Sequence, residues 1–198
     1  VVPELYNSIR LVKHKKYAVQ EGMVNMEIIQ KILNDTRIAE EPELPFPQAD
    51  SFERVINLCE LLKQKGFISK DDITQNYDFD RRQTDYYSNA GKYLGLIEFV
   101  RENGQIGCSL TQAGVRVFNL PIIDRQLEFV KLILAHEVFR NVLRLYFDRG
   151  NVPTKDEIVE IMHDSRLYNI DSEQTYRHYL ISILNRRIDA EHRLLFLG

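Results

Sequence analysis

The dipeptide Asn103-Gly104, set between two short apolar runs, constrains the fold of this 198-residue chain more than any other feature of its sequence. Asn-Gly is the strongest short signal for a two-residue β-hairpin turn, because both residues tolerate the positive φ angles that such a turn requires. The stretches on both sides of the hairpin have apolar residues at helical spacing. The sequence therefore predicts a mainly helical α+β fold with a small β-hairpin over residues 97–110.

Three helices are predicted before the hairpin. An apolar stripe over residues 52–62 is followed by Gly66, a typical helix stop. A second helix is expected to start at Ser69, which has an aspartate three residues later. The sequence "DRRQ" at 80–83 has the spacing of a capping box, with Asp in place of Ser or Thr. A third helix is therefore predicted over residues 81–96.

The third helix has the side chains of a binding surface on one side. Tyr86, Ala90, Tyr93 and Ile97 predict its buried face. The opposite face is predicted to carry Arg81, Thr84, Asp85, Ser88 and Lys92, with Arg82 and Asn89 at its margins. In a major groove, Arg pairs with guanine, Asn with adenine and Lys with phosphate, and Asp85 either accepts from cytosine N4 or pairs with Arg81 or Arg82. A solvated helix face with internal ion pairs explains this stretch equally well.

The segment after the hairpin carries a resemblance to a known family. Leu110, Thr111 and Gly114 form a Leu-Thr-x-x-Gly motif, in which leucine reaches the core, threonine caps the next helix and glycine permits close packing. Together with three helices and a hairpin in this order, the motif resembles winged-helix DNA-binding domains. The resemblance implies a helix-turn-helix fold for residues 51–120, with the helix near 81–96 as the major-groove reader.

The hairpin would be the wing of such a domain. Arg101, Asn103 and Gln105 would then meet the DNA backbone or the minor groove. A polar turn without any DNA contact explains each of these three residues as well.

The features of residues 51–120 recur later in the chain in the same order, which indicates an internal duplication. The repeated pairs are Gly66 and Gly150, "SKDDI" at 69–73 and "TKDEI" at 154–158, and Asp-x-x-Gln at 80–83 and 171–174. We therefore predict a second, winged-helix-like domain over residues 121–198, which begins with one long helix that ends before Gly150. The outward face of its reading helix is predicted to hold Thr175, His178, Tyr179, Ser182 and Arg186. A surface histidine with no role is the more common explanation of His178.

Residues 1–50 are predicted to form an N-terminal arm that ends in the proline-rich linker "EEPELPFPQAD". Within this arm, "MVNMEIIQKILND" has the spacing of a short amphipathic helix. The expected order is therefore an arm followed by two tandem winged-helix domains.

The composition restricts the kinds of function. The net charge is −3, and residues 51–120 contain nine basic and nine acidic residues. Sequence-independent DNA binding depends on phosphate neutralisation, so a neutral domain is expected to be a selective reader or to bind protein instead. The apolar runs are a few residues long, and the two cysteines suit a reducing cytoplasm, so we expect a cytoplasmic protein without a membrane partner.

No catalytic motif is found in the sequence, and no cofactor or metal is expected. Whether the parent protein is an enzyme is left open, because any nuclease activity would lie in another domain. A tandem of winged helices resembles the recognition modules of some type II restriction enzymes, and also some replication initiators and regulators.

Three functions follow from these patterns. We expect a sequence-specific module of a bacterial restriction-type or related protein, which binds double-stranded DNA and is joined by a missing nuclease domain or a second copy. A free-standing transcription regulator or replication initiator, and a winged-helix module that binds protein, are the alternatives.

Overall fold

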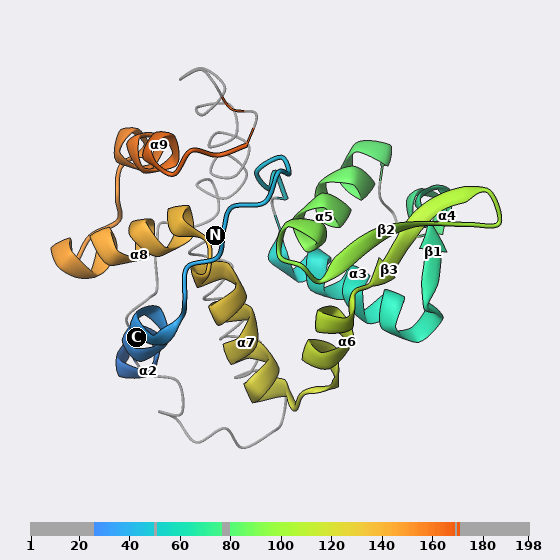
Figure 1. The fold of residues 1–198 in the computed structure, drawn as a ribbon, viewed down its shortest axis with the longest axis horizontal. Coiled ribbons are helices and arrows are strands. Elements are labelled where there is room, and N and C mark those ends of the chain that lie inside the picture. The colour runs from blue at the N-terminus through green and yellow to red at the C-terminus, as the bar shows by residue number, and fades with distance from the viewer. Residues whose placement is uncertain (1–25, 50, 77–79, 169, 171–198) are drawn as a thin grey trace. The chain divides into compact units, whose positions relative to one another are not determined.

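The computed structural model describes residues 26–49, 51–76, 80–168 and 170 (Figure 1). The chain divides into two compact units, each of which is described here by itself. Unit 2 spans Leu44–Leu120, and unit 1 combines the chain up to Glu43 with the chain from Pro121 onward. The boundary after Leu120 coincides with the one expected from the sequence, whereas the described residues before Leu44 belong to unit 1 and are not a separate arm.

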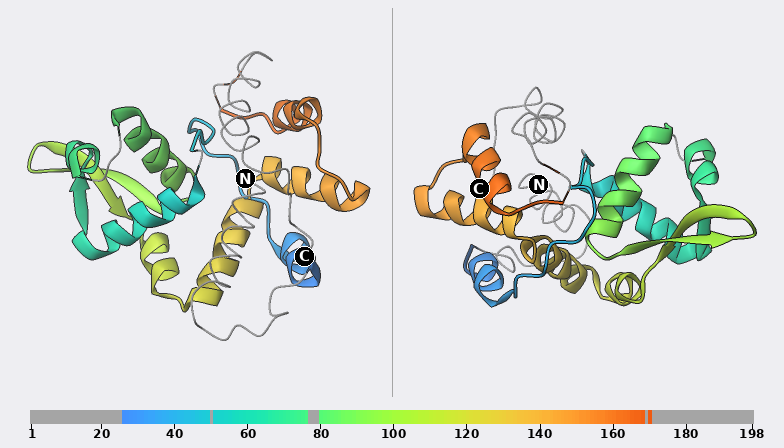
Figure 2. Two further views of the ribbon diagram at one scale, coloured as in Figure 1. Left: turned by 180° about the vertical axis from the view of Figure 1, so that it is seen from behind. Right: turned by 45° about the horizontal axis from the view of Figure 1, so that its top comes forward.

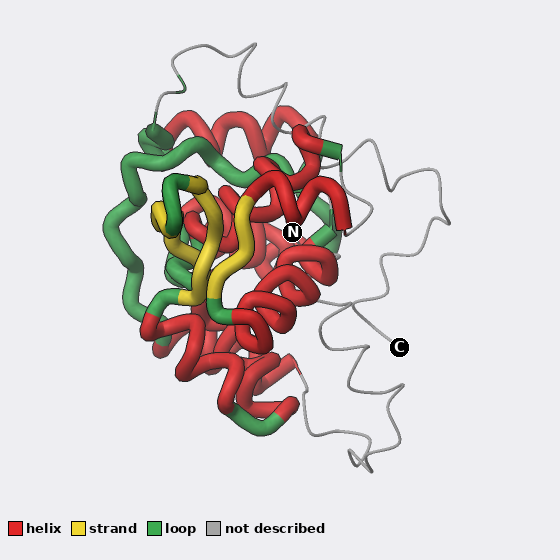
Figure 3. The backbone as a smooth tube through the Cα atoms, turned by 90° about the vertical axis from the view of Figure 1, so that its right-hand side faces the viewer, coloured by secondary structure: helices red, strands yellow, loops and turns green. Residues whose placement is uncertain are grey.

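Unit 2 has the mainly helical α+β architecture that the sequence predicts. Its elements are α3 (Phe52–Lys65), β1 (Phe67–Ser69), α4 (Lys70–Asn76), α5 (Arg81–Tyr93), β2 (Ile97–Glu102), β3 (Gln105–Leu110) and α6 (Gln112–Asn119). The three strands form one antiparallel sheet in the order β1-β3-β2 (Figure 3). The hairpin of β2 and β3 extends past the helices of its own unit (Figures 1 and 2).

The predicted helix starts in unit 2 are confirmed, as is the end of the first helix, whereas α5 ends at Tyr93 and not at residue 96, and Ile97 belongs to β2. Gly66 ends α3 with a φ of 77°, a conformation that glycine adopts without strain. Ser69 Oγ accepts a hydrogen bond from the backbone N–H of Asp72 at 3.1 Å, at the start of α4. Asp80 and Gln83 form the complete capping box of α5. These caps satisfy backbone groups that the first turn of a helix leaves unpaired, so they can be recognised locally in the sequence.

The predicted hairpin is also confirmed. Asn103 and Gly104 have φ angles of 50° and 80°, the left-handed pair that a two-residue turn of this kind requires. Thr111 caps α6 by accepting from the N–H of Gly114 at 2.9 Å. A β-carbon at Gly114 would lie 2.3 Å from the carbonyl oxygen of Leu96, which confirms that this glycine permits close packing.

Strand β1 is an element that the sequence did not reveal. Its three residues are too few to show an alternating pattern, and their β structure depends on pairing with β3. Phe67 pairs with Ser109, and Ile68 pairs with Cys108. β1 is an edge strand of the sheet, and β3 lies between it and β2.

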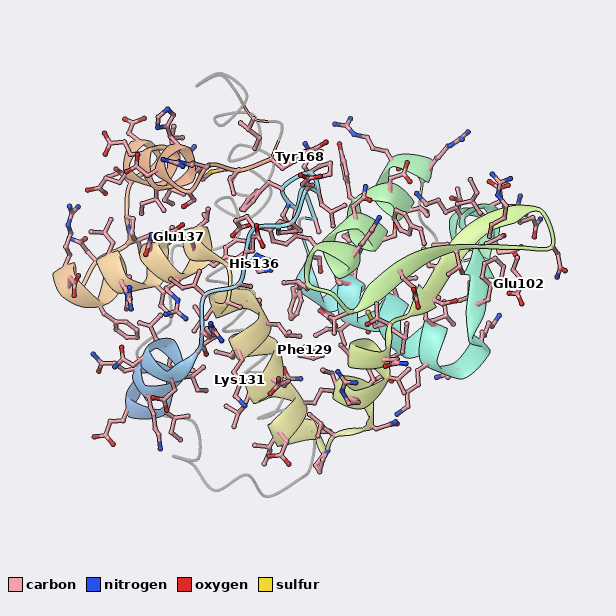
Figure 4. All side chains as sticks on the ribbon, viewed as in Figure 1. Glu102, Phe129, Lys131, His136, Glu137 and Tyr168 are labelled. Carbon is pink, nitrogen blue, oxygen red and sulfur yellow. The ribbon has the colours of Figure 1, made fainter. Side chains whose placement is uncertain are left out.

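The described part of unit 1 consists of helices. They are α2 (Met26–Asp35), which the sequence predicts, α7 (Ile122–Leu134), α8 (Glu137–Arg149) and α9 (Lys155–Asp164). The prediction of a single long helix before Gly150 is wrong, because α7 and α8 are separate helices. The helical conformation is interrupted at His136, whose backbone is extended with a φ of −88° and a ψ of 131° (Figure 4).

Tertiary contacts explain this break, since side chains and backbone from other segments take over the hydrogen bonds of the helix ends. The carbonyl groups that end α7 accept from Arg140 and from the segment after α2, and the first N–H of α8 donates to a glutamate. The contacts are Ala39 N to Ala135 O at 2.9 Å, Arg140 Nε to Leu134 O at 3.0 Å and Glu137 N to Glu41 Oε1 at 3.2 Å. A helical pattern read from the sequence alone contains none of these partners.

The second copy of the duplicated pattern is seen in part. Gly150 ends α8 with a φ of 68°, and Thr154 begins α9 in a capping box with Glu157. The sequence-predicted reading helix of this copy lies outside the described residues, with Thr175, His178, Tyr179, Ser182 and Arg186. Among the residues that the structure describes, no helix is both long and apolar enough to cross a membrane.

Candidate nucleic-acid interface

Helix α5 does not present the face that the sequence predicted. Thr84 and Ser88 were expected to point outward, yet their exposed fractions are 1% and 0%. Tyr87 is buried at 1%, whereas Tyr86, expected in the core, is half-buried. Ala90 and Tyr93 are buried as predicted. The prediction that Thr84 and Ser88 contact DNA is therefore wrong, because neither side chain reaches the surface.

The physical reason is that α5 is buried on two sides. Tyr87 lies on one buried side, where its ring is 5.7 Å from the guanidinium carbon of Arg54 in α3. On the other side, Thr84 Oγ1 shares a hydrogen bond of 3.0 Å with Thr74 Oγ1 of α4. Gly91, one turn after Ser88, lets Ile97 of β2 approach so closely that a β-carbon there would be 2.4 Å from it. Small residues thus allow α4 and the sheet to pack against this side.

The solvent-facing part of α5 is consequently a narrow strip at helical spacing. We define the α5 strip as Arg82, Asp85, Tyr86, Asn89 and Lys92, preceded by the exposed Arg81. Within it, the Arg82 guanidinium lies 5.2 Å from the Tyr86 ring centre, and its Nε donates to the Tyr86 hydroxyl. The strip and Arg81 together keep five of the seven side chains that the sequence assigned to the reading face of this helix.

Lysines from two helices meet around Phe99 of β2. Lys70 Nζ lies 4.3 Å from the centre of the Phe99 ring, and Lys92 Nζ lies 4.8 Å from it. Lys70 also donates to Asp85 Oδ1 at 2.6 Å, so the structure pairs Asp85 with α4 and not with the arginines suggested by the sequence. This cluster joins the α5 strip to the sheet.

The hairpin extends this surface. Arg101 follows Phe99 at a spacing of two, so both side chains lie on the same face of the sheet. Arg101, Asn103 and Gln105 are all exposed, as expected. Gln105 pairs with Glu102, which alternates to the other face of the sheet, and so Gln105 lies on that face as well. Arg101 is thus the hairpin residue that the fold brings to the Phe99 cluster.

Sequence reasoning missed Lys70, Phe99 and Ile106 as members of this surface. Lys70 was read as the start of a helix, and Phe99 as part of a strand; their meeting depends on the packing of α4 and α5 against β2. Ile106 is directly opposite Arg101 in the sheet and is 51% exposed. The sequence contains no signal that Ile106 is exposed, because β3 does not alternate regularly between buried and exposed residues.

The buried thiols of unit 2 do not offer a nucleophile. Burial raises the pKa of the Cys59 thiol well above its usual range. Burial also raises the pKa of Cys108 to about 11, with a smaller opposing effect from Lys70. Both thiols therefore stay protonated at neutral pH, and the thiolate is the reactive form of cysteine. Within the described ranges, no group of three or more His, Cys, Asp or Glu side chains is arranged to hold a metal ion.

The arrangement offers guanidinium, ammonium and amide donors from α4, α5 and β2 around one carboxylate. A comparison with family models gives one description, Domain of unknown function (DUF7226), which matches residues 54–185. The matched range includes α3 to α9, and so it contains the whole of this surface. No curated protein and no solved structure matches the chain.

Proposed function

The chain belongs to the DUF7226 family, and from this premise we propose that unit 2 is a winged helix that recognises double-stranded DNA. The proposal gives α5 the role of the major-groove reader and the β2–β3 hairpin the role of the wing. It replaces the reading face expected from the sequence with the α5 strip.

The observation that carries the proposal is the collection of basic side chains along one continuous surface of a neutral domain. We define the basic surface as Lys70, Arg81, Arg82, Lys92 and Arg101. Its continuity follows from contacts: Lys70 and Lys92 both lie on Phe99, and Arg101 is two residues further along the same strand. A basic surface of this kind is what phosphate neutralisation needs, and because the rest of the domain is acidic, DNA of arbitrary sequence is attracted only weakly.

The topology of unit 2 supports the winged-helix part of the proposal. Its elements follow as helix, strand, helix, helix, strand, strand, and the first strand pairs with the last. In helix-turn-helix proteins the second helix of the pair enters the major groove, and α5 is the second helix of the α4–α5 pair. Its N-terminal turn, which carries Arg81 and Arg82, is the turn that would reach the base edges.

The side chains then have separate roles. Arg81 or Arg82 pairs with guanine O6 and N7, and Asn89 pairs with an adenine. Lys92 and Arg101 contact phosphates and position the domain without reading sequence. Thr84 and Ser88 contribute by holding α5 against α4 and the sheet, not by touching DNA.

The test is selection of duplexes from a random-sequence pool by the 198-residue chain, followed by binding measurements on variants. Arg82→Ala should relax the preference at one base pair by about 1–3 kcal/mol, whereas Lys92→Ala should weaken all duplexes alike and lower the salt slope by about 1. Arg116→Ala is the matched control, since Arg116 is an exposed arginine of α6 outside the basic surface. Equal binding by all three variants and the parent would disprove DNA recognition by α5.

A second candidate function is protein binding by the same unit. It is favoured by the exposed Ile106 on the hairpin, since exposed isoleucine suits a protein interface better than a phosphate backbone. A partner bound through Ile106 would be released by Ile106→Asp and not by added salt. A restriction-type role in the cytoplasm belongs to the first proposal. It depends on the resemblance of the sequence to tandem winged-helix recognition modules.

A further inference from the structure

Asp85 is an acidic residue in the centre of the α5 strip. It lies one helical turn after Arg82 and two turns before Lys92, so it occupies the position that faces a bound duplex most directly in the proposed mode. Its side chain is 45% exposed, and its Oδ1 accepts from Lys70 Nζ at 2.6 Å. The second carboxylate oxygen is therefore available to a ligand.

A carboxylate at this position opposes binding to DNA of arbitrary sequence in two ways. It repels phosphates from the middle of the basic surface, and it keeps the ammonium group of Lys70 occupied. The ion pair is partly exposed, and ion pairs near the surface contribute little to stability. Asp85 is thus not needed to hold α4 against α5, where Thr74 and Thr84 already share a part-buried hydrogen bond.

The chemistry of the base edges determines which sequences relieve this penalty. A carboxylate accepts hydrogen bonds and donates none. In the major groove it is matched by the amino group of cytosine N4 and less well by that of adenine N6, because adenine also carries the acceptor N7. It is mismatched by the acceptors guanine O6 and N7 and thymine O4. A group that penalises wrong partners more than it rewards the right one is a common source of specificity.

We propose that Asp85 is a specificity-determining residue, which excludes random DNA and admits a site where a cytosine amino group faces it. This inference rests on the proposed function of unit 2. In it, Lys70 is the one member of the basic surface that does not bind phosphate in the parent chain, because its ion pair with Asp85 makes it a positioning residue for that carboxylate.

The test compares the parent chain with Asp85→Asn, which preserves the size of the side chain and removes its charge. We expect Asp85→Asn to bind random-sequence duplexes about fivefold more tightly, with a salt slope steeper by about 0.9, because one more phosphate is neutralised when Lys70 is released. Affinity for the duplex selected by the parent should rise less or fall. The ratio of selected to random affinity should therefore drop by about fivefold or more, the loss expected for one base contact.

Two further variants separate this role from a general charge effect. Glu98→Gln removes the same charge from β2, on the face of the sheet opposite Phe99, and should leave the affinity ratio unchanged. Lys70→Ala should lower the salt slope when combined with Asp85→Asn and leave it nearly unchanged in the parent. Thermal unfolding of each variant should match the parent, since Asp85 and Lys70 are partly exposed.

The inference is overturned if the parent binds DNA and Arg82→Ala weakens it, while Asp85→Asn leaves the ratio of selected to random affinity as it was. In that outcome the proposed function stands. If neither the parent nor Asp85→Asn retains any duplex, the proposed function fails and this inference fails with it. A drop in the ratio that Glu98→Gln reproduces also overturns the role of Asp85, since the effect is then one of total charge.

Discussion

Placing a lysine at Ser88 or at its neighbour Asn89 tests the observed orientation of α5. Ser88 is fully buried and donates to the carbonyl of Thr84 at 2.6 Å, whereas Asn89 belongs to the α5 strip. The two variants introduce the same side chain and the same charge at consecutive positions. If the outward face expected from the sequence were correct, Ser88→Lys would be harmless and would strengthen DNA binding.

Three effects lower the free energy of unfolding in Ser88→Lys. Overfilling a packed site costs about 1–3 kcal/mol, losing a hydrogen bond costs about 1 kcal/mol, and an unpaired buried ammonium costs several more. Even if the new side chain partly escapes to solvent, the free energy of unfolding should fall by about 4 kcal/mol, a large part of the 5–15 kcal/mol typical of a domain. Asn89→Lys, an exposed substitution, should change the free energy of unfolding by less than about 0.5 kcal/mol.

Urea unfolding followed by circular dichroism measures the difference. With an m-value of about 2 kcal/mol/M, a loss of 4 kcal/mol lowers the midpoint by about 2 M. The midpoint of Asn89→Lys should remain with that of the parent. Equal midpoints for the two variants would refute the burial of Ser88 and restore the face predicted from the sequence.

Two further predictions concern packing and pH. Gly114→Ala should lower the free energy of unfolding by about 1–3 kcal/mol in urea titrations, because its β-carbon would meet a backbone carbonyl that cannot rotate away. Gly91→Ala should cost less, since its β-carbon meets the flexible end of Ile97; a larger loss for Gly91→Ala would contradict this account. Hydrogen bonds from Thr154 and Arg149 lower the pKa of Glu157 from about 4.5 to about 2. The stability from this cap is present above pH 4.5 and is lost as the pH falls toward 2, so thermal unfolding of Glu157→Gln should show a flatter pH dependence there.

The features of this protein that the sequence predicted correctly are local. The turn at Asn103-Gly104 and the cap of α5 at Asp80 each involve residues within four positions of one another. Backbone groups at a turn or a helix end must find a partner nearby, and few side chains can supply one. Such elements can therefore be predicted from the sequence without knowledge of the tertiary structure.

The orientation of α5 could not be predicted from the sequence, because the sequence does not show how many elements pack against a helix. A helical wheel assumes one buried side, and Thr84 and Ser88 are polar enough to be assigned to the other. Their burial depends on α4 and the sheet, which cover this side of the helix. The Thr84 hydroxyl shares a hydrogen bond with Thr74 of α4, and the Ser88 hydroxyl donates to the Thr84 carbonyl of its own helix. The surface at Phe99 could not be predicted for the same reason. Its two lysines come from different helices and meet only when both helices pack against β2.

The sequence by itself determined where the helices of unit 2 begin, where the chain turns and that this unit combines helices with a hairpin. Tertiary structure decided which side of α5 faces solvent, the pairing of β1 with β3 and the break between α7 and α8 at His136. The physical reason is the range of the interactions. Caps and turns satisfy backbone groups within a few residues, whereas burial and the Lys70–Asp85 ion pair depend on segments that meet only after the chain has folded.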